Sequence, residues 1–381
     1  MPDTALPYGR QWIDDDDVVA VVEALRSDFL TTGPRIAAFE QALSAHTGGA
    51  QVAVVSSGTA ALHAAYAAIG IGPGDEVIMP PLTFAATGNA ALYLGARPVF
   101  VDIEGDSGLI DAAAVEAAIG PRTRAIVAVD YTGHPADYDA LDAIANRHGL
   151  ALIADAAHAL GATYHGRAVG TLATLTTLSF HPVKHITTAE GGAVAGPDAV
   201  LIDSVRTFRN HGIVRDEARF RRHDGAWYHE MQSLGFNYRI TDVGCALGLS
   251  QLRRLDAFLA RRRAIAARYT AALATVPGLS LPAVAPDVSP AWHLYVIRTA
   301  DPSRRRPLFD AMRRQGLGVQ VHYIPVYRHP YYEDLGYSEG LCPKAEGYYA
   351  RAISIPIFPA MSDADVERVI TCVADAVRVA A

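Results

Sequence analysis

The stretch AIVAVDYTGHPADYDALDAIANRHGLALIAD, residues 125–155, holds two short apolar runs on either side of a longer segment rich in helix formers. Ala125–Val129 and Ala151–Ala154 are apolar at every position, which is typical of strands that are buried on both faces of a parallel sheet. Asp137–His148 has the length and composition of a helix. Because parallel strands need a crossover connection, this stretch predicts a strand–helix–strand unit of an α/β fold.

The same alternation continues on both sides of this unit. The further strands that we predict are Val52–Val55, Glu76–Met79, Arg97–Val101, Leu175–Phe180 and Gly192–Ala195. The helices that we predict between them are Ala60–Ile69, Ala85–Leu94 and Asp111–Ile119. This pattern indicates a mostly parallel sheet that is covered by helices on both faces.

The rest of the chain predicts a helical amino-terminal arm and a smaller carboxy-terminal α/β domain. We expect a helix capped by Asp14–Asp17, helices at Arg35–His46 and Thr241–Leu273, a strand at His293–Arg298, a helix at Pro307–Gln315, a strand at Val319–Tyr323 and a final helix at Ala364–Val379. The proline-rich segment Pro277–Pro290 is the predicted linker. It divides a large domain, residues 1–275, from a small domain, residues 276–381. The arginine runs at 261–263 and 304–306 are interpreted as solvated helix faces.

Composition excludes several classes of protein. The 381 residues include 33 Lys and Arg against 40 Asp and Glu, a formal net charge of −7, which argues against a nucleic-acid-binding protein. The three cysteines are too few and too far apart for a disulfide framework or a CxxC metal site. The amino-terminal segment lacks the features of a signal peptide, and no apolar run has the length of a membrane span. We therefore expect a cytoplasmic protein without a membrane partner or a metal.

Two turns that follow predicted strands carry residues suited to an anionic, aromatic ligand. Ser57-Gly58-Thr59 opens a helix, where backbone N–H groups and hydroxyls suit a phosphate, although the same residues are common in a simple helix cap. Asp155 ends a buried strand, where its charge needs a partner such as a protonated ring nitrogen. Its alternative role is to cap the next segment. His158 could lie on the same side as Asp155 or be a buried histidine bonded to backbone.

A loop between two further predicted strands contains Lys184. A lysine amine that is removed from water loses its charge more readily and becomes a nucleophile for a carbonyl carbon, although most lysines are solvated surface residues. Ser179 lies five positions earlier and can contribute to a phosphate site. Phe84, just beyond another strand, can stack on a flat ring or belong to the core. His181 and His185 have the spacing of metal ligands, but no other cluster supports a metal site.

Together these motifs resemble the DegT/StrS family of nucleotide-sugar aminotransferases over nearly the whole chain. The resemblance rests on Ser57-Gly58-Thr59, on the run Asp155-Ala-Ala-His158, and on Ser179-Phe-His-Pro-Val-Lys184 followed by Glu190-Gly-Gly192. It implies an aspartate-aminotransferase-like fold of type I and the cofactor pyridoxal phosphate (PLP).

The resemblance also implies a role for each matching residue. Lys184 would hold PLP as a Schiff base and act as the catalytic residue, Asp155 would pair with the pyridine nitrogen, and Phe84 would stack on the ring. The residues implied at the phosphate are Ser57, Gly58, Thr59 and Ser179, together with Asn237 from the partner subunit of a homodimer. The residues implied near the sugar nucleotide are Thr31, Arg239, His322 and Tyr323.

His158 narrows the resemblance, because most of the family has glutamine at that position. Histidine there is similar to the pseudaminic-acid branch of the family. That branch aminates a UDP-linked 4-keto-6-deoxy N-acetyl sugar with glutamate as the donor. Two alternatives stay open: an aminotransferase for another nucleotide-linked keto sugar, of an antibiotic or a surface glycan, and a PLP-binding protein without turnover.

Overall fold

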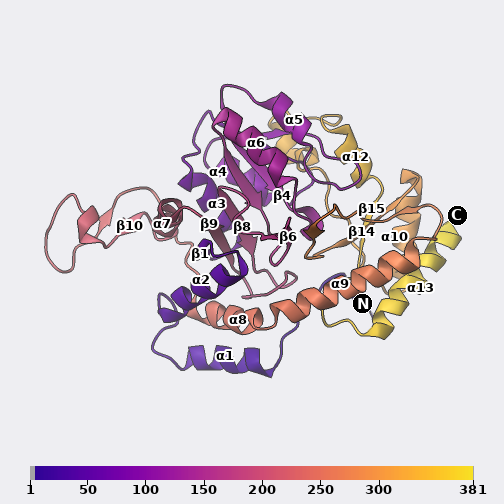
Figure 1. Cartoon of the computed structure of the whole chain (residues 1–381), viewed down its shortest axis with the longest axis horizontal. Coiled ribbons are helices and arrows are strands. Elements are labelled where there is room, and N and C mark those ends of the chain that lie inside the picture. The colour runs from indigo at the N-terminus through magenta and orange to yellow at the C-terminus, as the bar shows by residue number, and fades with distance from the viewer. Residues whose placement is uncertain (1–4, 381) are drawn as a thin grey trace.

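The computed structural model describes residues 5–380 and is built around a seven-stranded, mostly parallel sheet (Figure 1). The strands lie in the order β1-β9-β8-β5-β4-β2-β3, and only β9 runs against its neighbours. Their bounds are β1 Gln51–Val55, β2 Glu76–Met79, β3 Arg97–Phe100, β4 Thr123–Val129, β5 Ala151–Asp155, β8 Leu175–Ser179 and β9 Gly192–Gly196. All seven predicted strands are confirmed, with ends within two residues.

Helices cover both faces of this sheet, as the sequence predicts. Alternate residues of one strand enter different cores: Ile126 belongs to a core shared with α2, α5, α6 and α8, whereas Val127 belongs to a core shared with α3, α4 and α7. This alternation explains why the strands are apolar at every position. The bounds are α2 Pro34–His46, α3 Gly58–Ala68, α4 Ala86–Tyr93, α5 Ala112–Ala118, α6 Tyr138–His148, α7 Ala199–Phe208 and α8 Asp242–Leu252.

The predicted long helix at residues 241–273 is two helices. The first is α8, and the second, α9 (Leu255–Leu273), begins after a break at Arg253 and Arg254. Arg254 forms ion pairs with Asp14 and Asp17 at the start of α1 (Asp15–Leu25), where those two aspartates also form the predicted cap. The break therefore lies where the amino-terminal helix packs against the body of the protein.

A third core lies in the carboxy-terminal part, around a sheet of order β12-β14-β15. The remaining elements are β6 Thr163–Tyr164, β7 Arg167–Ala168, β12 Leu279–Ser280, β13 Val288–Ser289, β14 Tyr295–Thr299, α10 Arg305–Arg314, α11 Pro330–Asp334, α12 Pro343–Tyr349, β15 Ala352–Ile355 and α13 Asp363–Ala380. The strand predicted at Val319–Tyr323 is wrong, because this segment forms only a single bridge, Gln320 with Ser354. The domain boundary near residue 275 stays a prediction.

One interpretation of the arginine runs is also wrong. Arg262 in α9 is fully buried, and its guanidinium donates to the backbone carbonyls of His293 and Ile357. Because α9 is covered by other elements around Arg262, this arginine does not lie on a solvated helix face.

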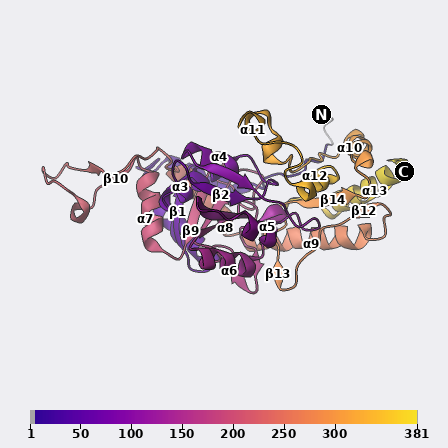
Figure 2. The same ribbon diagram turned by 90° about the horizontal axis from the view of Figure 1, so that it is seen from above.

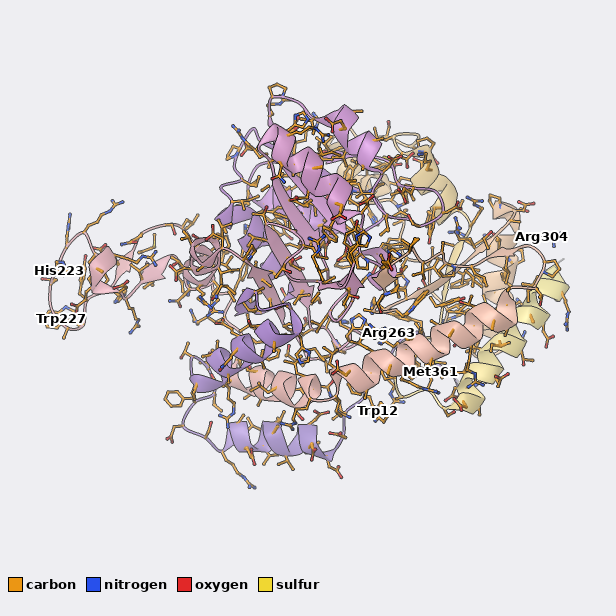
Figure 3. All side chains as sticks on the ribbon, in the orientation of Figure 1. Trp12, His223, Trp227, Arg263, Arg304 and Met361 are labelled. Carbon is orange, nitrogen blue, oxygen red and sulfur yellow. The ribbon has the colours of Figure 1, made fainter. Side chains whose placement is uncertain are left out.

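A hairpin arm, residues 212–236, projects from the body beside α7 (Figures 1 and 2). It contains β10 (Ile213–Val214) and β11 (Glu230–Met231), and His223 and Trp227 lie at its tip (Figure 3). Glu230 accepts from the backbone N–H groups of Arg221 and Arg222 and so closes the tip. Within residues 5–380, no helix is long and apolar enough to cross a membrane.

Candidate active site

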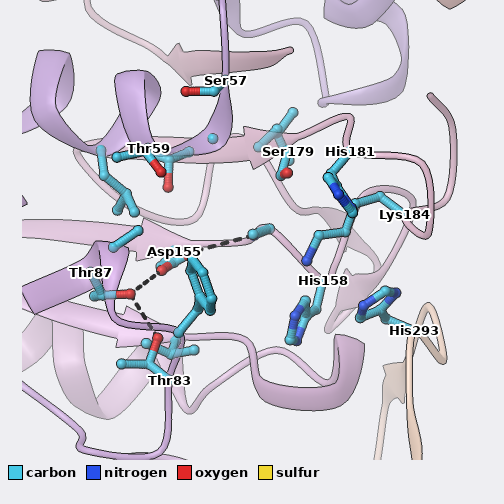
Figure 4. Close-up of a pocket in the computed structure, with 18 of the residues that line it drawn as sticks. Ser57, Thr59, Thr83, Thr87, Asp155, His158, Ser179, His181, Lys184 and His293 are labelled. Atoms are coloured by element: carbon cyan, nitrogen blue, oxygen red, sulfur yellow. Dashed lines mark hydrogen bonds between the residues drawn. The ribbon is translucent and has the colours of Figure 1, made fainter. Parts of the chain in front are cut away.

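The turns after β1, β5 and β8 meet at one edge of the large sheet and border a cavity of about 500 Å³ (Figure 4). These are carboxyl ends of strands, where open α/β sheets bind their ligands. Ten of the residues predicted from the sequence line this one cavity: Ser57, Gly58, Thr59, Phe84, Asp155, His158, Ser179, Lys184, His322 and Tyr323. The topology therefore brings together residues that the sequence scatters over more than half of the chain.

Asp155 lies buried at the end of β5, in the middle of the sheet. Burial raises the pKa of its carboxyl group, and a hydrogen bond from the Thr87 hydroxyl to Oδ2, 2.6 Å long, works against that rise. Oδ1 accepts only one long bond, 3.3 Å, from the Ala157 N–H. A buried carboxylate with spare acceptor capacity on its pocket side suits a protonated ring nitrogen.

Lys184 stands on the opposite side of the cavity from Asp155 and forms no ion pair with it in the described residues (Figure 4). The side chain is partly exposed through the pocket, yet the surrounding protein removes enough water to lower the pKa of its amine to about 8. Hydrogen bonds between Phe180 and Gly191 and between Thr188 and Phe180 close the loop that carries it. The chain has only one other lysine, Lys344, which is exposed and paired with Asp111.

The predicted phosphate turn forms a cradle at the start of α3. Ser57 is the N-cap, and its hydroxyl accepts from the Ala60 N–H at 3.0 Å, so the capping alternative is also correct. The Gly58 and Thr59 N–H groups have no acceptor within residues 5–380. A Cβ added at Gly58 would lie 2.9 Å from Ser179 Cβ, which explains why glycine stands there.

The other side of the cavity is aromatic. The His158 Nε2 lies 3.3 Å from the Tyr323 hydroxyl, and the ring of Tyr323 faces that of Phe84 edge-on. His322 bonds to Ser354 Oγ at 2.8 Å, and burial lowers its pKa to about 4. Phe84 is 64% exposed, so it is not the core phenylalanine of the alternative interpretation. These rings make a flat-walled slot that suits an aromatic ligand.

Three predicted residues do not line this cavity. Asn237 is exposed beside Asn210, Thr31 bridges to Thr241, and Arg239 donates to Asn210 Oδ1 at 2.9 Å. Arg239 borders a second cavity of about 330 Å³ on the same chain. None of the three therefore lines the first cavity in its own chain.

Sequence reasoning missed several lining residues. Thr83, just before α4, and Thr87, in its first turn, are four positions apart in the sequence, a spacing that could have suggested a relay of hydroxyl groups. Tyr8 reaches the cavity because the amino-terminal strand segment bonds to Gly318 and Ile357, and no local signal predicts this. His293 lies against His158 and is equally invisible in the sequence.

These features fit PLP. A cradle with two N–H groups that lack an acceptor in the described residues, a buried carboxylate and a partly desolvated lysine border the same cavity, which matches a phosphate, a ring nitrogen and an aldehyde respectively. No group of three or more His, Cys, Asp or Glu side chains suited to a metal ion occurs within residues 5–380.

Comparisons with known proteins agree with this geometry. The model of the DegT/DnrJ/EryC1/StrS aminotransferase family matches residues 11–374. The spore coat polysaccharide biosynthesis protein SpsC of Bacillus subtilis (strain 168) is 41% identical over 378 residues, 98% of this chain and 97% of that protein.

Solved structures agree as well. PseC of Helicobacter pylori, an aminotransferase involved in the biosynthesis of pseudoaminic acid, is 32% identical with a TM-score of 0.93, covering 99% of this chain and 100% of that one. Spr1654 of Streptococcus pneumoniae, solved in its PLP form, is 29% identical with a TM-score of 0.93, covering 99% and 100%.

Proposed function

The chain belongs to the DegT/DnrJ/EryC1/StrS aminotransferase family, whose cofactor is PLP, and on that premise we propose a specific reaction for it. It transfers the amino group of L-glutamate to the C4 carbonyl of a UDP-linked 4-keto-6-deoxy N-acetyl sugar. Glutamate leaves as its keto acid, so the two half-reactions balance. The observation that carries the proposal is the placement of Lys184 and Asp155 on opposite sides of one cavity.

Each residue of the cavity has a definite task in this proposal. When bound, PLP supplies an electron sink for the carbon that gains or loses a proton. Asp155 holds a negative charge against the ring nitrogen and so keeps that nitrogen protonated. The Lys184 amine, with its pKa lowered to about 8, is neutral in a useful fraction of molecules and moves the proton to and from the reacting carbon.

The remaining residues orient the ligands. The N–H groups of Gly58 and Thr59, with the hydroxyl of Ser179, hold the phosphate. Phe84 would stack on the ring of bound PLP, and His158 would face the hydroxyl group of that ring. His322 and Tyr323, which line the cavity, border the space left for the sugar. In the proposed homodimer, Arg239 and Thr31 of a second copy reach this space.

The proposal also specifies the acceptor, a UDP-linked 4-keto-6-deoxy N-acetyl sugar. It is supported by His158 at the proposed cofactor site and by the similarity, over 99% of this chain, to PseC, an aminotransferase involved in the biosynthesis of pseudoaminic acid. The expected product is UDP-4-amino-4,6-dideoxy-N-acetyl-β-L-altrosamine, a precursor of pseudaminic acid.

A second candidate is supported by a separate observation, the 41% identity to a spore coat polysaccharide protein. In that case the chain aminates a different nucleotide-linked keto sugar for a surface glycan. Both candidates use the same half-reaction with the amino donor and differ only in the acceptor sugar.

One experiment separates these possibilities. The purified protein is loaded with PLP, mixed with glutamate and scanned for the change in cofactor absorbance that marks transfer of the amino group. A panel of UDP- and dTDP-linked 3-keto and 4-keto sugars is then added, and the product masses are measured. Amination of the UDP-linked 4-keto-6-deoxy N-acetyl sugar supports the first candidate, and amination of another sugar supports the second. A protein that binds PLP but never changes its absorbance with any amino donor is not an aminotransferase.

A further inference from the structure

The backbone of the segment 291–294, just before β14, forms hydrogen bonds to the segment that follows β4. The Ala291 N–H donates to Gly133 O at 2.9 Å, and the Leu294 N–H donates to Thr132 O at 3.2 Å. Gly133 has a φ of +96°, and a Cβ there would lie 2.6 Å from His158 O and 3.0 Å from His293 N. Only glycine therefore lets this segment approach the end of β5 so closely.

Two further side chains, a buried histidine and a buried arginine, form hydrogen bonds to backbone carbonyl groups of the same segment. His185, next to Lys184, bonds to Ala291 O through Nε2 at 3.0 Å. The Arg262 guanidinium donates to Trp292 O at 3.1 Å and weakly to His293 O at 3.4 Å. The backbone on both sides of His293 thus has partners on three different elements.

The result is a close contact between two imidazole rings. The ring centroids of His158 and His293 lie 4.3 Å apart with 36° between the ring planes, and both residues line the cavity (Figure 4). Both are almost fully buried, and the Nδ1 atoms of both have no hydrogen-bond partner in the described residues. A charged imidazole in this position would be poorly solvated and would lie against another ring.

The surrounding charges act in the same direction. Burial lowers the pKa of His158 well below its usual value, and Lys184, His322 and His185 lower it further. Burial also lowers the pKa of His293, with contributions from His158, Lys184, His185 and Arg262. Within residues 5–380, the one side chain that bonds to the His158 ring is Tyr323, which offers a hydroxyl group and not a charge. Both rings are therefore neutral around pH 7.

We propose that His293 is a positioning residue that shields one face of the His158 imidazole from water and so keeps that ring neutral and correctly oriented toward the cofactor. The proposal rests on the proposed PLP site and goes beyond it, because His293 itself bonds neither to Lys184 nor to Asp155 in this structure. Position 293 therefore requires a side chain with a flat, apolar face, and this side chain does not need to be ionisable. Phenylalanine should therefore replace His293, whereas alanine should not.

The test compares His293→Ala with His293→Phe in full-length protein. Histidine ring signals are followed by NMR against pH, with and without PLP, and the absorbance of bound PLP is titrated in parallel. In His293→Ala, water reaches His158, and its pKa should rise toward the usual value by about one unit or more. The acid limb of kcat should move to higher pH by a similar amount. At neutral pH kcat should fall about tenfold with KM for glutamate changed less than about twofold. His293→Phe should restore all of these values to near wild type.

A matched control is His134→Leu, which removes another buried histidine, one that bonds to backbone outside the cavity. It can lower the melting temperature but should leave the His158 titration and kcat unchanged.

If His293→Ala is too unstable to study, His293→Gln, which keeps the size but not the flat face, replaces it with the same expectation. The proposal is overturned if the alanine or glutamine variant leaves the His158 titration unchanged, or if the phenylalanine variant is as impaired as the alanine variant. Failure of the proposed function would show differently, as a wild-type protein whose bound PLP never changes its absorbance with any amino donor. The histidine titration without PLP would still test the contact.

Discussion

Thr87 donates its hydroxyl hydrogen to Asp155 Oδ2 over 2.6 Å, and Thr83 Oγ1 lies 2.7 Å from Thr87 Oγ1. An ionised carboxylate only accepts hydrogen bonds, so the direction of this relay is from Thr83 to Thr87 to Asp155. The relay runs from the segment before α4 into its first turn and favours the charged form of a carboxyl group whose pKa burial raises. It is therefore expected to support the electron-withdrawing role proposed for Asp155.

Replacing Thr87 with valine tests this relay without a change of volume. Loss of a hydrogen bond to a buried carboxylate costs about 2 kcal/mol, which corresponds to a decrease in kcat of up to roughly thirtyfold. The pKa of Asp155 should rise further, so activity should be lost at a higher pH on the acid side than in the wild type. A pH profile of kcat measures both effects. Thr83→Val, one step further from Asp155, should give a smaller change in the same direction, and equal effects of the two variants would contradict the order of the relay.

The presence of only two lysines makes the role of Lys184 easy to test. Lys184→Ala should abolish amino transfer, because no other amine in the cavity can bind the cofactor covalently or move the proton. Borohydride reduction of the PLP-loaded protein, followed by peptide mass spectrometry, should place the cofactor on Lys184 in the wild type and in Lys344→Ala. Cofactor on Lys344 or turnover by Lys184→Ala would refute the assignment.

The pKa of about 8 for Lys184 predicts how cofactor capture depends on pH. Only the neutral amine attacks an aldehyde, and the neutral fraction grows about tenfold per pH unit below the pKa. The rate at which cofactor-free protein captures PLP should therefore rise steeply up to about pH 8 and then level off. Stopped-flow absorbance measures this rate. A rise that continues to the pKa of an ordinary lysine would mean that the site does not desolvate the amine.

Gly58→Ala tests the phosphate cradle. The new Cβ would lie 2.9 Å from Ser179 Cβ, so Ser179 or the turn must shift away from the place proposed for the phosphate. We expect the Kd for PLP to rise by about tenfold or more, equivalent to about 1.4 kcal/mol. Gly347→Ala is the matched helical control, because its Cβ meets nothing within 4 Å. Equilibrium titration of PLP into both variants checks this, and equal affinities would place the phosphate elsewhere.

Asn237 tests the shared site of the proposed homodimer. It is exposed and absent from the lining of the cavity in its own chain, and we expect it to reach the cofactor phosphate of a second copy. Asn237→Ala is expected to be strongly impaired by itself, and a larger replacement serves if it is not. Mixed with Lys184→Ala chains, it forms heterodimers in which one site carries both defects and the other carries neither.

Activity should then return on subunit exchange, to at most about half of the wild-type value per dimer. Exchange is verified with chains that carry different affinity tags. Mixed dimers that form and stay inactive would show that Asn237 does not serve the partner's site.

Much of the fold and part of the site could be predicted from the sequence. The strands and helices of the large sheet follow from local apolar periodicity, and their ends differ from the structure by one or two residues. The strand predicted at Val319–Tyr323 failed because β-branched and aromatic residues also occur in an irregular segment that is held by other elements. Here the Tyr131 hydroxyl bonds to His322 O, and β15 takes the place beside β14. The burial of Arg262 was equally unpredictable, because a run of three arginines gives no sign that the third core surrounds the middle one.

The sequence by itself determined the sheet, the order of its strands along the chain, and the turns that carry Gly58, Asp155 and Lys184. These features depend on contacts within a few residues, and such contacts leave a periodic or positional trace in the sequence. Only the tertiary structure decided that Thr87 faces Asp155, that His293 lies against His158, and that Asn237 and Arg239 lie away from the cavity of their own chain. These relationships join residues that are distant in the chain. Their distances are set by the packing of the sheet, the helices and the segment before β14. No local sequence pattern encodes this packing.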